Sequence, residues 1–259
     1  MLGRVIAVAN QKGGVGKTTT SINLSACLAQ SGKRVLAVDI DPQGNCTSGL
    51  GLDKNSLQCS IYDLLMGQCY TEDAVSSTLI EDLFIIPSNI ELSTIENALL
   101  NSISRENILK KLLSGIKNDY DFIVIDTMPS LNFMTINAMN AADSVLIPMQ
   151  PQYFSAKGLE LLLSTIASVK KNLNRKLKID GILMTMYDSR LNFHKEIFDV
   201  IFENYGKNLK IFETKIPISI RVTEMQARSQ SVFDNDPTSK ISENYAAFTN
   251  ELINGGKQI

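Results

Sequence analysis

One short run constrains the fold of this 259-residue chain more than any other feature. The apolar segment Val5–Ala9 leads directly into a glycine cluster and then into Gly16-Lys17-Thr18-Thr19. Glycines carry no Cβ, so successive backbone N–H groups can turn toward one centre and bind phosphate oxygens. A helix that begins directly after the loop presents its positive end to the same oxygens. The alternative is a plain glycine-rich turn before a helix. The order of strand, glycines, Gly-Lys-Thr-Thr and helix favours a phosphate-binding loop.

The residues of this loop predict an enzyme that binds and hydrolyses ATP with Mg²⁺. Lys17 is expected to reach the β- and γ-phosphates, and the hydroxyl of Thr18 is expected to ligate magnesium. The predicted nucleotide-binding residues of the loop are Gly13, Gly14, Val15, Gly16, Lys17, Thr18 and Thr19.

Apolar runs that alternate with helical stretches predict an α/β fold. The runs are rich in Val and Ile and nearly continuous in hydrophobicity, as in strands buried on both faces. They are Val5–Ala9, Val35–Val38, Leu83–Ile86, Phe122–Ile125, Val145–Ile147, Ile179–Met184 and Leu209–Phe212. The predicted crossover helices are Ser21–Ser31, Asn107–Ile116 and Lys157–Leu173. We expect one doubly wound domain over residues 1–259, with a mostly parallel β-sheet and helices on both faces. Its ligand is expected beyond the carboxyl ends of the strands.

Acidic residues follow two of the predicted strands. Asp126 ends Phe122–Ile125, while Asp39 and Asp41 follow Val35–Val38. An Asp at the end of a buried strand beside a phosphate-binding loop commonly holds magnesium, often through water. Taken singly, such an Asp is more often a cap or a turn residue. Because two such strands accompany this loop, we assign Asp126 to magnesium.

Composition indicates a protein without a metal cluster, a signal peptide or a membrane-spanning segment. The four cysteines show no C-x-x-C spacing, and His194 is the single histidine, which argues against a zinc site. We expect free, buried thiols in a reducing cytoplasm. The net charge is −2, but residues 157–228 carry 13 Lys/Arg and 8 Asp/Glu, against 12 and 19 in the remainder. This basic part is either a solvated surface or a patch that faces DNA.

The loop departs from the standard Walker A pattern, because the first glycine of that pattern would fall at Gln11. The run Lys12-Gly13-Gly14-Val15-Gly16-Lys17-Thr18 instead resembles the deviant Walker A motif of the ParA/MinD family. The resemblance implies that Lys12 reaches across a dimer interface to phosphates in the partner subunit. It also implies that Asp41 orients the attacking water and that Asp39 supports the loop and the magnesium shell. From the residues alone, Lys12 could equally be a surface lysine.

Further motifs resemble the ParA (Soj-like) branch of that family. They are Asp41-Pro42-Gln43-Gly44-Asn45, Thr47-Ser48-Gly49-Leu50-Gly51 and Thr135-Ile136-Asn137-Ala138. The resemblance implies an ATP-dependent homodimer that binds DNA non-specifically, associates with the nucleoid and is stimulated by a ParB-type partner. Arg190 and Arg221 match DNA-binding positions, although each could instead form a surface salt bridge. Pro217 resembles the loop beside the adenine. The chain departs from the branch over residues 126–132 and 224–231.

Two other functions share the deviant loop. MinD-like positioning ATPases end in a basic amphipathic helix that binds membranes. The stripe Ile241, Tyr245, Phe248 and Leu252 lacks a Lys/Arg cluster beside it, so we expect it to pack on the core and expect no membrane partner. A small-molecule kinase or synthetase is the second alternative. It would transfer phosphate to an acceptor other than water.

Overall fold

A seven-stranded sheet runs through the computed structural model, which describes residues 3–152, 155–220, 231 and 238–255, with the backbone alone for 155–157. The strand order is β3-β4-β2-β5-β1-β6-β7, and only the pairing of β3 with β4 is antiparallel. The strands are β1 (Arg4–Val8), β2 (Val35–Ile40), β3 (Ser76–Ser77), β4 (Leu83–Ile86), β5 (Phe122–Thr127), β6 (Ser144–Met149) and β7 (Lys178–Met184).

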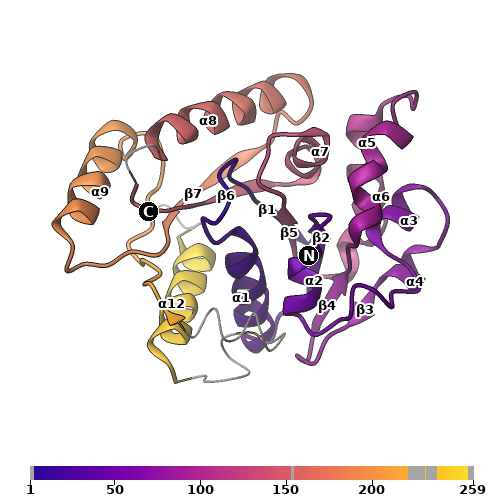
Figure 1. Ribbon diagram of the computed structural model, residues 1–259, viewed down its shortest axis with the longest axis horizontal. Helices are drawn as coiled ribbons and strands as arrows, with labels where there is room; N and C mark the ends of the chain where they lie inside the picture. Colours follow the sequence, from indigo (N-terminus) through magenta and orange to yellow (C-terminus); the bar gives the residue numbers. More distant parts are fainter. Residues whose placement is uncertain (1–2, 153–154, 221–230, 232–237, 256–259) are drawn as a thin grey trace.

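Helices cover both faces of the sheet, as the sequence predicts (Figure 1). The α-helices are α1 (Lys17–Gln30), α2 (Asn45–Gly49), α3 (Ile61–Leu65), α4 (Thr71–Ala74), α5 (Ile95–Ala98), α6 (Ile108–Ile116), α7 (Phe133–Ala141), α8 (Ser155–Asn172), α9 (Asn192–Tyr205) and α12 (Lys240–Asn254). Three 3₁₀ turns are η1 (Ile90–Thr94), η2 (Arg105–Asn107) and η3 (Lys117–Asp119).

Successive residues of β1 show why two helical layers form. Val5 and Ala7 face a core shared with α3, α6, α7, α8 and α9, while Ile6 and Val8 face a core shared with α1 and α12. Side chains of a strand alternate between its faces, so a strand that is apolar at every position must be covered on both sides. This arrangement confirms the predicted doubly wound α/β architecture.

The prediction of a strand over Leu209–Phe212 is wrong. This segment makes one isolated bridge to β7, in which Ile182 N donates to Lys210 O and Phe212 N donates to Ile182 O. Its apolar character serves packing instead, because the ring of Phe212 lies 4.9 Å from that of Phe248 on α12. The short strand β3 has the polar sequence Ser-Ser and gave no sequence signal.

The apolar stripe of the last helix packs on the core, as predicted. Ile241, Tyr245, Phe248 and Leu252 are all buried, against the face of the sheet that α1 also covers. Within the part of the chain that the structure describes, no helix is both long and apolar enough to span a bilayer.

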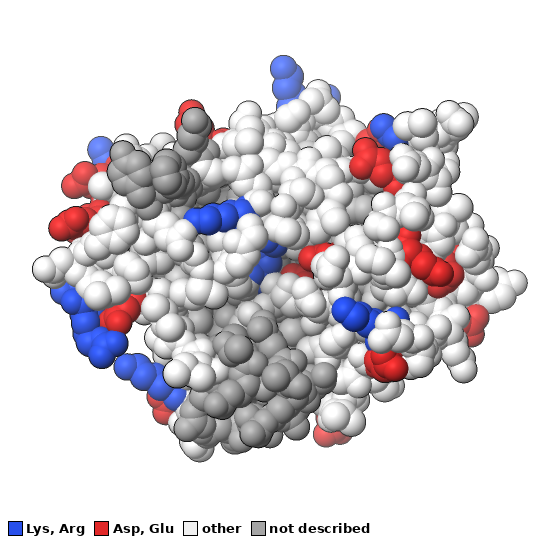
Figure 2. Space-filling model, viewed as in Figure 1, with Lys and Arg blue, Asp and Glu red and all other residues white. Residues whose placement is uncertain are grey.

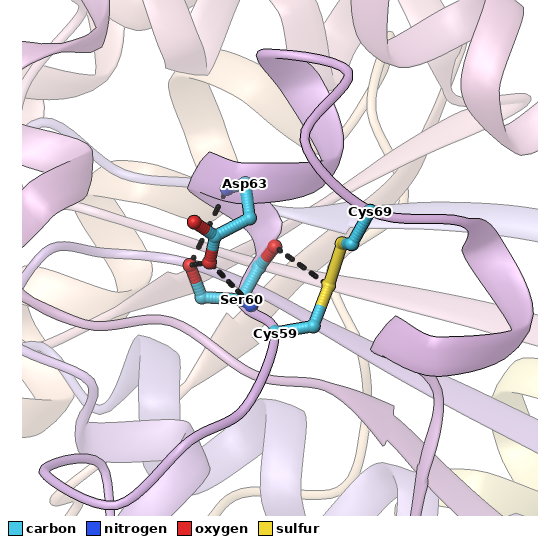
Figure 3. The surroundings of a disulfide bond; sticks show 4 residues. All are labelled: Cys59, Ser60, Asp63 and Cys69. Carbon is cyan, nitrogen blue, oxygen red and sulfur yellow. Dashed lines mark hydrogen bonds between the residues drawn. A yellow bond between two sulfur atoms is a disulfide. The ribbon is translucent and has the colours of Figure 1, made fainter.

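The expectation of four free thiols is wrong for one pair. Cys59 and Cys69 form a disulfide across α3 (Figure 3). Cys27 and Cys46 are free and buried. The helix begins at a capping box, in which Ser60 and Asp63 exchange hydrogen bonds, and the chain then turns back. This turn brings the two Cα atoms to 6.5 Å, within the range for a disulfide. A spacing of ten residues gives no such signal in the sequence.

Candidate nucleotide-binding site

A cavity of about 420 Å³ lies at the carboxyl ends of the central strands. The residues that line it come from the loop after β1, the turns after β2 and β5, and the segment after β7. They are Gly14, Gly16, Lys17, Thr18, Thr19, Asp41, Asn45, Ser48, Gly49, Pro129 and Met186. Figure 2 looks onto this region, where basic and acidic side chains meet in a hollow near the centre of the face. Parallel strands all end at one edge of a sheet, so the predicted motifs converge there.

The loop after β1 has the backbone of a phosphate-binding nest. Gly14 and Gly16 adopt φ angles of 73° and 83°, in the left-handed region that favours glycine. Helix α1 begins at Lys17, and its N-cap Gly16 has no side chain to occupy the first N–H groups. Those groups and the positive end of α1 therefore face the cavity, where they suit phosphate oxygens.

Lys17 is buried at this site with only 6% of its surface exposed. Its ammonium group donates to the carbonyl of Lys12 at 2.9 Å. Burial lowers the pKa of Lys17, and the negative charges of Asp126 and Asp41 act in the opposite direction. A cation held between a nest of N–H groups and two carboxylates can neutralise the terminal phosphates of a nucleotide.

Asp126 is fully buried at the end of β5 and has an oxygen without a partner. Oδ1 accepts a hydrogen bond from Ser21 Oγ at 2.8 Å, while Oδ2 has no partner among the described residues. Burial raises the pKa of Asp126 to about 8, and the charge of Asp39 adds to the effect. Thr18 and Ser21 act in the opposite direction on this pKa. An unpartnered carboxylate oxygen beside the Thr18 hydroxyl fits Mg²⁺, which prefers such hard oxygen ligands.

Asp39 lies opposite Asp126 in the register of β2 and β5, yet its oxygens are occupied. Oδ1 accepts from Asp41 N at 3.0 Å, and Oδ2 accepts from Thr47 N at 2.9 Å and from Thr47 Oγ1 at 2.8 Å. Burial raises the pKa of Asp39 to about 6, and these donors limit the rise. Asp39 thereby fixes the turn that places Asp41 on the cavity wall.

Several predicted residues are not among those that line the cavity in the described structure: Lys12, Gly13, Val15, Arg190 and Pro217. The ammonium group of Lys12 donates to Gln152 Oε1. Pro217 makes a parallel bridge to Tyr187, whose neighbour Met186 does line the cavity. Arg190 has 86% of its side chain exposed and forms an ion pair with Asp188 at 2.7 Å. Arg221 and residues 224–230 lie outside the described residues.

Several residues of the site escaped sequence reasoning. Ser21 supplies the donor to Asp126, while Gln150 and Thr185 donate to the carbonyls of Gly14 and Val15. Met186, also missed, has a positive φ of 51°. Ser21 was recognisable from its place one turn after Thr18 on the same helix. Gln150 and Thr185 follow β6 and β7, and only the sheet order brings them to the loop.

Comparisons with known proteins agree with this geometry. Residues 3–179 match the family model described as AAA domain. Over 255 residues the chain is 44% identical to the sporulation initiation inhibitor protein Soj of Bacillus subtilis, covering 98% of this chain and all of that protein. It is 40% identical to the chromosome-partitioning ATPase Soj of Treponema pallidum, covering 97% and 98%. A solved structure of cobyrinic acid a,c-diamide synthase from Mycobacterium smegmatis, with bound ATP analog and magnesium, superposes with a TM-score of 0.89. It is 35% identical and covers 99% of this chain and 96% of that one.

Proposed function

The chain belongs to the ParA/Soj family of partition ATPases, enzymes that use ATP and Mg²⁺, and from this premise we propose how it works. ATP closes two subunits into a dimer that binds DNA non-specifically. Hydrolysis, stimulated by a ParB-type partner, opens the dimer and releases the DNA. The nucleotide thus controls a conformational equilibrium that partners can bias.

The observation that carries the proposal is the different placement of the two loop lysines. Lys17 lines the cavity of its own subunit and is buried there, whereas Lys12 is not among the residues that line it and donates to Gln152. This difference supports a role for Lys12 other than binding phosphates in its own subunit, and we propose that it contacts phosphates in a second subunit. An added cation there would neutralise charge that develops during phosphoryl transfer.

Within one subunit the side chains have distinct tasks. We assign Thr18 and Asp126 to hold Mg²⁺, which would neutralise phosphate charge when bound. Lys17 holds the β- and γ-phosphates. Asp41 lines the cavity and orients the attacking water, while Asp39 holds the turn that carries Asp41.

DNA binding would use the basic part of the chain. Residues 157–228 carry an excess of five positive charges. Figure 2 shows Lys and Arg side chains along the lower left edge below α9, with some acidic groups among them. Since Asp188 partly neutralises Arg190, one subunit offers only a weak patch. Pairing two patches in the ATP-bound dimer would make phosphate contacts strong enough to matter.

A gel-shift titration with plasmid DNA at several salt concentrations tests this function. The wild type is expected to bind with ATP and poorly with ADP, and affinity should fall by about 0.9 log units per log unit of salt for each phosphate bound. Lys12→Ala should prevent ATP-dependent dimerisation, followed by light scattering, and so prevent DNA binding. Arg190→Ala should still dimerise, but its salt slope should be lower by about 1 for each phosphate that the missing guanidinium no longer neutralises. Equal binding with ATP and ADP would contradict the proposal and make liposome cosedimentation the next experiment.

A second candidate is a synthase that passes the phosphate to an organic acceptor. The 35% identity to the Mycobacterium smegmatis structure named as a synthase favours testing it. Steady phosphate release from ATP without any organic acceptor supports the partition ATPase. Turnover that starts only when an organic acid and an amine donor are added would support the synthase.

A further inference from the structure

A directional chain of hydrogen bonds connects Lys12 to the backbone of the phosphate-binding loop. The ammonium group of Lys12 donates to Gln152 Oε1. Gln152 Nε2 donates to Gln150 Oε1 at 2.8 Å, and Gln150 Nε2 donates to the carbonyl of Gly14 at 2.7 Å. The same Nε2 also contacts Met186 Sδ in the cavity wall. This series of hydrogen bonds therefore leads from the ammonium group of Lys12 to the backbone of the phosphate-binding loop.

Both ends set the polarity of this series of hydrogen bonds. An ammonium group can only donate and a carbonyl can only accept, so Gln152 presents its oxygen to Lys12, and Gln150 presents its N–H to Gly14. The middle hydrogen bond, from Gln152 to Gln150, fits both ends at once. Without the lysine, only the Gly14 carbonyl orients the two amides.

The last hydrogen bond of this series, to the Gly14 carbonyl, affects the loop because a peptide unit is planar. When the Gly14 carbonyl turns outward to Gln150, the N–H of Val15 in the same peptide must point the opposite way. N–H groups that are turned away from such a carbonyl contact are the groups that a phosphate-binding nest uses. Gln150 has only 9% of its surface exposed while Gly14 is exposed, so the hydrogen bond between them is partly buried.

Thr185 holds the next peptide but has no link to Lys12. Its Oγ1 donates to the Val15 carbonyl at 2.8 Å, and the side chain is 2% exposed. The same planarity turns the N–H of Gly16 away from Thr185. The loop is thus held by two side chains from neighbouring strands, and only one of them depends on the lysine.

We propose that Gln150 is a positioning residue that couples the position of Lys12 to the orientation of the Gly14–Val15 peptide. While Lys12 remains on Gln152, the loop is set to hold phosphates in its own subunit. When Lys12 leaves, Gln150 remains the donor to the Gly14 carbonyl, but the two amides are oriented from one end alone and hold the loop less firmly. The departure of Lys12 to a partner subunit rests on the proposed function, whereas the coupling itself operates within one subunit.

Equilibrium binding of fluorescent ADP to single subunits tests the coupling without dimerisation or DNA. Gln150→Met keeps the length of the side chain and should weaken ADP binding up to about tenfold, as expected when one partly buried hydrogen bond is removed. Thr185→Val should cause a similar loss of about tenfold, and Thr185→Ser should restore affinity. Gln152→Ala should weaken binding about threefold, because it removes only the orienting interaction.

The decisive comparison repeats these changes in a Lys12→Ala background. Gln152→Ala should then have no further effect, because no lysine remains to orient the amide, while Thr185→Val should keep its full effect. The coupling is overturned if Gln152→Ala weakens binding equally in both backgrounds, or if Gln150→Met binds ADP as the wild type does. Thermal unfolding of each variant identifies changes that act through folding alone. A failed DNA experiment with an intact double-variant result would overturn the proposed function and leave the coupling standing.

Discussion

Asp39 and Asp126 stand opposite each other on neighbouring strands, and both are fully buried, but their surroundings differ. Asp39 is surrounded by three donors from its own turn. Asp126 has one hydroxyl donor from α1 and an oxygen that no described residue occupies. A satisfied buried carboxylate organises the backbone around it. An unsatisfied one is costly until a cation joins it, which is the property a metal ligand requires.

The largest expected difference between the two is in stability without nucleotide. Asp39→Asn keeps one acceptor oxygen but turns an NH2 group toward one or two of the three donors, and should lower the free energy of unfolding by about 2–4 kcal/mol. Asp126→Asn removes a poorly paired buried acid and should leave stability unchanged or increase it. Urea denaturation in EDTA measures both. If Asp126→Asn proved the more destabilising change, the comparison would be wrong.

In Mg²⁺-dependent ATP binding, by contrast with stability, Asp126→Asn should have the larger effect of the two variants. Asp126→Asn should lose about 10–100-fold of the ATP affinity that Mg²⁺ confers, which corresponds to one charge-assisted interaction. Asp39→Asn, measured at low temperature on folded protein, should keep the dependence on Mg²⁺. Titration of ATP by calorimetry with and without Mg²⁺ gives both values. Equal losses in the two variants would place both carboxylates in the metal shell.

The next largest difference between Asp39 and Asp126 is expected in the pH dependence of stability. Aspartates in the unfolded chain have a pKa of about 4. In the folded protein, burial raises the pKa of Asp126 to about 8 and that of Asp39 to about 6. The folded state therefore binds more protons, and the free energy of unfolding falls as pH rises from about 4 to 8. The slope should reach about 1.4 kcal/mol per pH unit for each group. Because the two neighbouring carboxylates titrate as a pair, Asp126→Asn should reduce the slope, most at the alkaline end of this range. An unchanged slope there would contradict the assignment.

The smallest expected effect comes from the donor to Asp126. Ser21→Ala should change the free energy of unfolding by about 1 kcal/mol or less, because a single hydroxyl is removed. Thr47→Val is the matched change at Asp39. It removes a donor to that carboxylate and the oxygen that accepts from Ser88 N, and should cost about 2 kcal/mol. Equal effects of the two changes in urea denaturation would show that the donors do not distinguish these sites.

The predictable part of this protein is local. Glycines followed by Lys17 and Thr18 specify a phosphate-binding loop because backbone conformation and helix start are fixed by neighbouring residues. Strands that are apolar on both faces, such as Val35–Ile40, need only their own sequence to indicate a covered sheet. The spacing of Ile241, Tyr245, Phe248 and Leu252 likewise predicted a packed helix face, and these residues are buried.

Only the tertiary structure decided which side chains meet, whether their partners lie near or far along the chain. The apolar run Leu209–Phe212 is the same in composition whether it pairs in a sheet or packs on α12, and its position beside β7 allows one bridge. Cys59 and Cys69 became partners through the turn around α3. Two acids at equivalent strand ends, Asp39 and Asp126, acquired different surroundings from Thr47 and Ser21. Local sequence sets which groups a segment can offer, but burial and hydrogen bonding depend on which segments meet, and that follows from the order of strands in the sheet.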